Sequence, residues 1–135
     1  MENIDYRRNR HSCYLLEYRL VVVTKYRHPV ITGQLKTRLI ELSKQIIEGY
    51  WECKISAINT DKDHIHIMFE AKPQIQLSKL INNFKTVASR RIRKEFADKL
   101  KPFYRKPYFW SDSYFVCTVS DRSRDIIEKY IVNQS

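Results

Sequence analysis

The heptapeptide DHIHIMF, residues 63–69, alternates strictly between two kinds of side chain. Successive side chains of a β-strand point to opposite faces, so a strand here directs its aliphatic and aromatic residues to one face: Ile65, Ile67 and Phe69. That set predicts a face packed on a hydrophobic core. The opposite face would carry His64 and His66. Two neighbouring imidazoles can be a pair of metal ligands or two histidines without a functional role. The alternation alone does not distinguish these explanations.

Similar periodicities assign the rest of the chain to strands and helices. Runs rich in β-branched and aromatic residues predict strands at 13–24, 51–60, 64–71 and 114–120. Apolar residues at helical spacing predict helices at 34–48, 76–97 and 121–134. The order is therefore β-α-β-β-α-β-α, with a short polar turn that joins the two middle strands as a hairpin. We expect an α+β fold of ferredoxin-like or RRM-like type, a four-stranded antiparallel sheet with helices, in one domain spanning residues 1–135.

Charge is the informative bulk property of this sequence. Its 25 Lys and Arg against 15 Asp and Glu give a formal net charge of +10 over 135 residues. Such an excess favours a polyanionic partner, most often nucleic acid, because cations contact phosphates and release counterions. A basic but inert surface is the alternative.

Three absences predict a cytoplasmic protein without a membrane partner. No stretch approaches the roughly 18 consecutive apolar residues of a membrane span, and the start MENIDYRRNRH lacks the apolar run of a signal peptide. The cysteines Cys13, Cys53 and Cys117 are far apart and in no metal-ligand spacing. We therefore expect buried thiols in a reducing compartment.

Two polar residues near the C-terminus share one face of the predicted last helix. Tyr130 and Gln134 are four residues apart, so their side chains stack along the helix. Tyr130 also continues the apolar stripe begun by Ile126 and is expected to point toward the sheet. An edge-of-core tyrosine is the simpler explanation of that position. The inward amide of Gln134 suggests a partner for its carbonyl oxygen.

The order of these elements, together with several segments, resembles the single-tyrosine transposases of IS200/IS605-type insertion sequences. The segments are VVVTKYRHPVI at 21–31, DHIHIMF at 63–69, WSDSYFV at 110–116 and YIVNQ at 130–134. These enzymes belong to the HUH nucleases, which are named for two histidines flanking a hydrophobic residue. The similarity extends over residues 14–134, and the segments occur in the family's order.

The resemblance implies a set of metal ligands. His64 and His66 would be the HUH ligands, and Gln134 would be the third. Asp61 and Asp63 flank the histidines and are possible alternative oxygen ligands or partners of the ligands, with Asp61 ranked above Asp63. The metal would be Mg²⁺ or Mn²⁺, although imidazole also suits Zn²⁺ and ligand type alone does not distinguish these ions.

The implied reaction is metal-dependent cleavage and rejoining of single-stranded DNA. Tyr130 would attack a phosphodiester to give a 5′-phosphotyrosine link and a free 3′-OH, and a later 3′-OH would displace the tyrosine. A tyrosine with a pKa of about 10 is protonated at neutral pH. The metal and neighbouring cations must therefore favour the phenolate, and Lys129 is one candidate.

The family acts on single strands and recognises imperfect DNA hairpins at the ends of its elements. The predicted DNA contacts are basic residues of the N-terminal stretch and of the second predicted helix: Arg7, Arg8, Arg10, His11, Lys79, Lys85 and Arg90. The resemblance also implies a homodimer joined through sheet edges, with each tyrosine serving its partner's histidines. The strand at 13–24 is the candidate edge.

Two alternatives remain open on sequence grounds. One is a non-catalytic nucleic-acid-binding module of the same fold, in which aromatic side chains on the sheet stack on bases. The other is a domesticated REP-type nuclease that cleaves chromosomal hairpin repeats. Its protein chemistry would be identical, so only the genomic surroundings would distinguish it.

Overall fold

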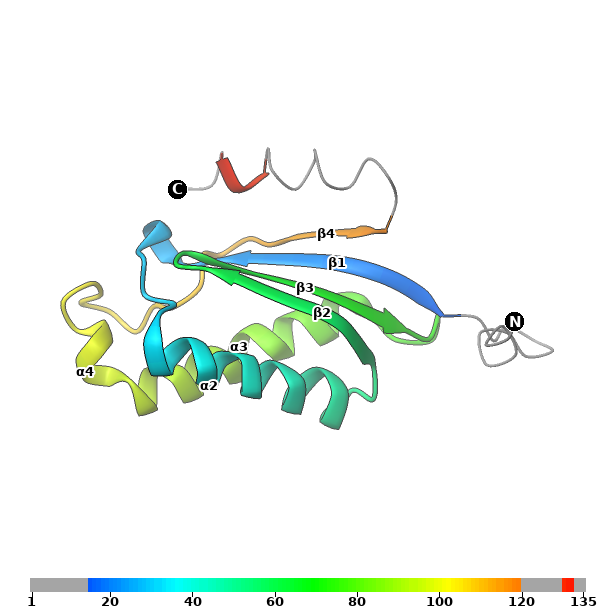
Figure 1. Ribbon diagram of the computed structural model, residues 1–135, viewed down its shortest axis with the longest axis horizontal. Helices are drawn as coiled ribbons and strands as arrows, with labels where there is room; N and C mark the ends of the chain where they lie inside the picture. Colours follow the sequence, from blue (N-terminus) through cyan, green and yellow to red (C-terminus); the bar gives the residue numbers. More distant parts are fainter. Residues whose placement is uncertain (1–14, 120–129, 133–135) are drawn as a thin grey trace.

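A computed structural model describes residues 15–119 and 130–132. In this part of the chain four strands form one sheet, and each neighbouring pair is antiparallel. The strands are β1 (Leu16–Val23), β2 (Lys54–Asp61), β3 (His64–Ala71) and β4 (Phe115–Thr118), in the order β2-β3-β1-β4. The two long helices lie against one face of this sheet (Figure 1). The predicted α+β fold with a ferredoxin-like antiparallel sheet is confirmed.

The strand register directs alternate residues of β1 and β3 to the helical face. Leu20 of β1 is opposite Ile67 of β3, and Val22 is opposite Ile65. All four side chains are fully buried. The alternation in DHIHIMF therefore has the predicted outcome, because its aliphatic half is in the core.

Helices α2 (Gly33–Lys44) and α3 (Leu77–Glu95) supply the other half of the core. Each helix turns an apolar stripe toward the sheet, as the helical spacing predicted. The buried residues of these stripes are Leu35, Leu39, Leu42, Leu80, Ile81, Phe84, Ala88 and Ile92. The core is therefore one layer of side chains between the sheet and the helices.

Several element boundaries differ from the prediction. The helix α2 continues into a π-helical segment, η2 (Gln45–Tyr50), so the helical region passes the predicted end at 48. Strand β2 begins at Lys54 and not at 51, because Glu52 has a left-handed φ of 57° that does not fit an extended strand. A short helix, α4 (Ala97–Leu100), follows α3 and was not predicted.

Strand β1 lies in the interior of the sheet. It is hydrogen-bonded to β3 on one side and to β4 on the other. The expectation that this strand offers a free edge for dimerisation is therefore wrong, and β2 and β4 form the edges of the described sheet. The physical reason is that the backbone N–H and C=O groups on both edges of β1 are used in pairing with β3 and β4.

Some sequence-based predictions fall on residues outside the described ranges: Arg7, Arg8, Arg10, His11, Cys13, Lys129 and Gln134. The predicted last helix lies outside them too, except for residues 130–132, which are helical. Cys53 is buried as expected, whereas Cys117 is only partly buried and packs against Val21 and Val23. Within the described residues, no helix has the length and apolar character that crossing a membrane requires.

Candidate active site on the open face of the sheet

The two histidines of β3 lie on the face of the sheet that α2 and α3 leave uncovered. His66 is opposite Val21 of β1, and His64 is opposite Val23. Residues opposite each other in an antiparallel pair point to the same face. The histidine pair therefore shares this open face with Val21 and Val23, while Ile65 between the two histidines enters the core.

His64 is held by a carboxylate next to it in the chain. Nδ1 of His64 lies 2.9 Å from Oδ1 of Asp63, and Oδ2 of Asp63 accepts a hydrogen bond of 2.9 Å from Nε of Arg27. Burial disfavours the charged carboxylate, but the hydrogen bonds from His64 and Arg27 outweigh it and lower the pKa of Asp63. An ionised carboxylate only accepts, so Nδ1 must carry the proton. When the ring is neutral, Nε2 of His64 is then the nitrogen that carries the lone pair.

His66, unlike His64, has a ring nitrogen without a hydrogen-bond partner among the described residues. Its Nε2 is buried, and no described residue offers it a hydrogen-bond partner. Burial lowers the pKa of His66, and its neighbours Arg19 and His64 lower it further. The imidazole is therefore neutral at pH 7, which is the form that binds metal. A buried nitrogen without a partner is costly to leave unsatisfied, and a divalent ion at the histidine pair would satisfy it.

Further ligands are not assembled within the described residues, where no group of three or more His, Cys, Asp and Glu side chains could hold a metal. Asp61 is opposite His64 on β2, but its side chain is exposed and its Oδ1 accepts the backbone N–H of Lys62 at 2.8 Å. Gln134 lies outside the described ranges. Asp63, which sequence reasoning ranked below Asp61, is the carboxylate that contacts a histidine.

Tyr130 lies on the same open face. It packs with Val21, Val23 and Phe115, and its ring centroid is 5.3 Å from that of Phe115. Figure 1 shows residues 130–132 (red) on the side of the sheet opposite α2 and α3. Because Val21 and Val23 are the strand partners of the two histidines, the phenol lies over β1 and β4, next to the strand β3 that carries the imidazoles, on one face of the sheet within a single chain.

The hydroxyl group of Tyr130 has a defined partner that the sequence did not indicate. It lies 3.2 Å from Oγ of Ser113, in the WSDS segment before β4. Burial raises the pKa of the Tyr130 phenol, and the hydrogen bond with Ser113 offsets part of that rise. The resting phenol is therefore protonated at neutral pH.

The segment that carries Ser113 is fixed by a lysine of α3. Nζ of Lys85 donates to the backbone carbonyls of Ser111 at 2.9 Å and Asp112 at 3.1 Å. Burial lowers the pKa of Lys85, and Asp112 partly opposes the shift. Lys85 was predicted to contact DNA, and in this structure its ammonium group is bonded to this loop.

The other predicted DNA contacts of α3 remain predictions. The side chains of Lys79 and Arg90 are exposed, but α3 lies on the face of the sheet opposite the histidines. Any DNA that contacts both α3 and the histidine pair must therefore pass around an edge of the sheet.

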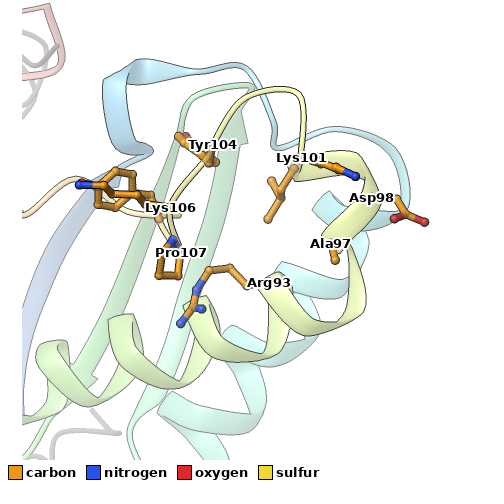
Figure 2. Close-up of a pocket in the computed structure, with 9 residues that line it drawn as sticks. Arg93, Ala97, Asp98, Lys101, Tyr104, Lys106 and Pro107 are labelled. Atoms are coloured by element: carbon orange, nitrogen blue, oxygen red, sulfur yellow. The ribbon is translucent and has the colours of Figure 1, made fainter.

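A basic groove follows α3 toward that edge. Two cavities of about 340 Å³ each lie between α3 and the loop of residues 101–112, and both are lined by Arg93, Pro107 and Tyr108. Figure 2 shows the first cavity, with Arg93 from α3 on one side and Pro107 from the loop on the other. We call the two cavities together the α3–loop groove. The second cavity reaches Ser111, two residues before Ser113. The charged lining residues are Lys85, Arg93, Asp98, Lys101, Lys106 and Asp112.

Comparison with known sequences relates this chain to transposases of the IS200 type. The family described as "Transposase IS200 like" matches residues 12–134. The chain is 28% identical over 131 residues to the ISDra2 transposase TnpA of Deinococcus radiodurans, covering 97% of this chain and 92% of that protein. It is also 28% identical over 125 residues to the transposase for insertion sequence element IS200 of Salmonella typhimurium, covering 92% of this chain and 80% of that protein.

Solved structures support the same fold. A crystal structure of a protein from Deinococcus radiodurans R1 that is named as a transposase superposes with a TM-score of 0.85 at 30% identity, covering 93% of this chain and 95% of that one. A REP-associated tyrosine transposase bound to a REP hairpin has a TM-score of 0.52 at 11% identity, covering 84% of this chain and 61% of that one. At that identity the second similarity concerns the fold alone.

Proposed function

The chain belongs to the family of IS200-like transposases, enzymes that act on DNA, and we propose that it cleaves and rejoins single-stranded DNA through Tyr130. In this proposal Tyr130 is the nucleophile, and His64 and His66 hold a divalent metal ion. The observation that carries the proposal is the placement of a half-buried phenol and two imidazoles on one open face of the sheet. This face lies opposite α2 and α3, and Tyr130 packs on it against the strand partners of the two histidines, Val21 and Val23.

The metal site rests on the chemistry of the two imidazoles. Nε2 of His66 is buried with no hydrogen-bond partner in the described part of the chain, and the contact of Nδ1 of His64 with Asp63 leaves Nε2 as the ligand atom of the neutral His64 ring. Gln134 is the proposed third ligand, and Asp61 is the alternative oxygen ligand. Mg²⁺ or Mn²⁺ bound there would neutralise charge on the phosphate and orient the scissile bond.

The covalent step uses Tyr130. Its phenolate oxygen attacks phosphorus, the bond from phosphorus to the 3′ oxygen breaks, and the 3′ oxygen takes up a proton to leave as a free 3′-OH. The product is a 5′-phosphotyrosine link, which conserves the bond energy for a later 3′-OH to rejoin the strands. The phenol must first lose its proton, and Oγ of Ser113, at 3.2 Å, is placed to donate a hydrogen bond to the phenolate that forms. Arg19, a cation near His66, is a candidate contact for the phosphate.

The proposed substrate is a single strand that carries a hairpin. The formal charge of +10 supports a polyanionic partner. The structural relative bound to a REP hairpin has the same fold. The α3–loop groove leads toward Ser113 and, with Lys79 and Arg90, offers candidate phosphate contacts. Arg7, Arg8, Arg10 and His11 remain proposed contacts as well. Action on cellular DNA would place the protein in the cytoplasm.

Dimerisation is part of the proposal. The described sheet has two edges, β2 and β4, either of which can pair with a second copy. In a dimer, Tyr130 could act on the histidines of its own chain, whose face it occupies in this structure, or on those of the partner.

A covalent adduct tests the proposed function. Single-stranded DNA from the flanks of the gene, incubated with the protein and Mg²⁺ or Mn²⁺, should give a protein–DNA adduct that resists SDS. The adduct should vanish in Tyr130→Phe and weaken sharply in His64→Ala or His66→Ala. Tyr50→Phe is the matched control, because Tyr50 is 73% exposed on the helical side of the molecule.

The alternatives give different results in the same assay. A non-catalytic module would bind the DNA but form no adduct, and chelator would have no effect beyond mild destabilisation. An adduct that persists in Tyr130→Phe would mean that another tyrosine is the nucleophile. A domesticated REP-type nuclease would form the adduct with chromosomal repeats and not with the gene's own flanks.

A further inference from the structure

The turn after β1 has an unusual backbone. It contains the 3-10 turn η1 (Lys25–Arg27), in which Tyr26 and Arg27 have φ angles of 58° and 54°. Two successive left-handed residues that are not glycine are rare, because the Cβ atom is crowded in this conformation. Strain of this kind persists only where the surroundings enforce it, and it is frequent near functional sites.

A buried threonine ties one end of this turn to the turn between β2 and β3. The backbone N–H of Thr24 donates to the carbonyl of Asp63 at 2.9 Å. The hydroxyl group of Thr24 donates to the carbonyl of His28 at 2.8 Å and lies 3.2 Å from that of Asp63. Thr24 is 0% exposed, so these bonds are shielded from water. The turn of Arg27 and the backbone of Asp63 are therefore fixed to each other.

The loop of residues 101–112 holds the turn from the other side. The hydroxyl group of Tyr104 donates to the carbonyl of Lys25 at 2.7 Å, and the N–H of Lys25 donates to the carbonyl of Phe109 at 2.9 Å. Tyr104 and Phe109 are both buried. The left-handed conformation is thus enforced by contacts on both flanks.

The fixed backbone of this turn places the side chain of Arg27 next to the carboxylate of Asp63. Its Nε donates to Oδ2 of Asp63 at 2.9 Å, while Oδ1 of Asp63 lies 2.9 Å from Nδ1 of His64. The side chains of Asp63 and His64 are only 18% and 17% exposed. Both oxygens of the carboxylate are engaged, so its plane is fixed between the guanidinium and the imidazole.

We propose that Arg27 is a positioning residue for His64, acting through Asp63 to fix the imidazole with Nε2 directed to the open face. A free imidazole can carry its proton on either nitrogen, and the hydrogen bond made by one nitrogen decides which is available as a ligand. Partners of this kind orient a metal-binding histidine and raise its basicity. The inference rests on the proposed metal role of His64.

Arginine suits this position better than lysine. Its Nε lies partway along the side chain in a rigid plane with fixed N–H directions, whereas a lysine ammonium group lies at the end of a flexible chain. Arg27→Lys should therefore keep the charge but restore the arrangement only partly. Arg27→Gln removes the charge and the Nε donor at similar length.

The tautomer of His64 is the direct readout, measured by ¹⁵N NMR on the metal-free protein with Arg27→Gln and Asp63→Asn. The wild type should carry the His64 proton on Nδ1. In Arg27→Gln the population with the proton on Nε2 should increase. In Asp63→Asn the single amide oxygen should face Arg27, so its NH₂ group faces Nδ1 and reverses the tautomer.

Binding of Mn²⁺, titrated by calorimetry, is the second readout. Loss of a partner of a metal ligand weakens affinity by about 10- to 100-fold, and we expect at least tenfold for Arg27→Gln, with Arg27→Lys intermediate. The matched control is Arg38→Gln. Arg38 pairs with Glu95 at 2.8 Å between α2 and α3 and is similarly shielded, so this variant should change neither Mn²⁺ affinity nor the His64 tautomer.

The outcomes separate this inference from the proposed function. A folded Arg27→Gln protein with the wild-type His64 tautomer would overturn the role of Arg27, whatever its activity. If Arg27→Gln does not fold, Arg27→Lys decides the question, because it keeps the charge but lacks the Nε donor, and a wild-type tautomer in that variant would overturn the role of the Nε donor. A wild type that binds no Mn²⁺ would contradict the proposed metal site, and the NMR result would still decide how His64 is positioned.

Discussion

The two histidines are chemically identical in the sequence and differently placed in the structure. His64 has a charged partner that fixes which nitrogen carries the proton. His66 has a buried Nε2 with no partner among the described residues. A fixed imidazole beside an unsatisfied one suits a site that is completed by a bound cation.

The Tyr130 phenol gives a prediction at the same scale. Its pKa is raised by burial and lowered in part by Ser113, so Ser113→Ala should raise the pKa further. NMR titration of protein labelled with ¹³C at tyrosine Cζ would measure this, with Tyr130→Phe to assign the signal. Ser89→Ala on α3 is the control and should leave the Tyr130 pKa unchanged. A lower pKa in Ser113→Ala would show that Ser113 does not stabilise the phenolate.

The raised pKa of Tyr130 also makes the free energy of unfolding depend on pH. The pKa of Tyr130 is higher in the folded chain than its unfolded value of about 10. The folded state therefore holds this proton more tightly. The stabilisation is fully present below about pH 10 and is lost as the pH rises through the folded-state pKa. Tyr130→Phe should remove this part of the pH dependence in denaturant unfolding.

At the scale of elements, β1 organises the molecule. Its LVVV segment, residues 20–23, sends Leu20 and Val22 to the helical face and Val21 and Val23 to the open face, and all four are 0% exposed. Val21 and Val23 form the apolar surface against which Tyr130 packs. One central strand thus supports both the core and the site.

Helix α3 gives the prediction at this scale. Phe84 is fully buried between α3 and the sheet, so Phe84→Ala should lower the free energy of unfolding by about 3–5 kcal/mol. Tyr50→Ala is the matched truncation at a side chain that is 73% exposed, and it should cost less than about 1 kcal/mol. Urea unfolding followed by circular dichroism would measure both. Equal losses would show that Phe84 does not lie in the core.

At the scale of the whole molecule, the sheet separates two surfaces. The histidines and Tyr130 are on the open face, and the α3–loop groove is on the helical side. The groove ends near Ser111, close in sequence to Ser113. A strand of DNA following the groove would therefore reach the edge of the sheet beside the proposed nucleophile.

The salt dependence of DNA binding tests this path. Removing one cation that binds a phosphate of single-stranded DNA reduces the slope of log K against log salt by about 0.7. The double variant Arg93→Gln with Lys101→Gln should therefore weaken binding and flatten the slope. Lys36→Gln with Lys44→Gln removes the same charge from exposed positions on α2 and should change the slope little. Equal slopes in the two double variants would exclude the groove as a DNA-binding surface.

Local sequence patterns determined much of this protein. A period of two put His64 and His66 on one face and Ile65 and Ile67 on the other, and a period near 3.6 located α2 and α3. These signals are readable because neighbours in sequence fix which side chains share a face. The segments that resemble the transposase family identified the same histidines and Tyr130 as candidates.

Only the tertiary structure decided which residues meet across the chain. Arg27 reaches Asp63 over 36 positions, and Ser113 reaches Tyr130 over 17. The interior place of β1, misjudged from the sequence, depends on the pairing of β4 with it. Such contacts depend on how strands and loops pack in three dimensions, and no periodicity along the chain encodes them. The sequence therefore identified the candidate site residues, and the tertiary structure decided which side chains contact them.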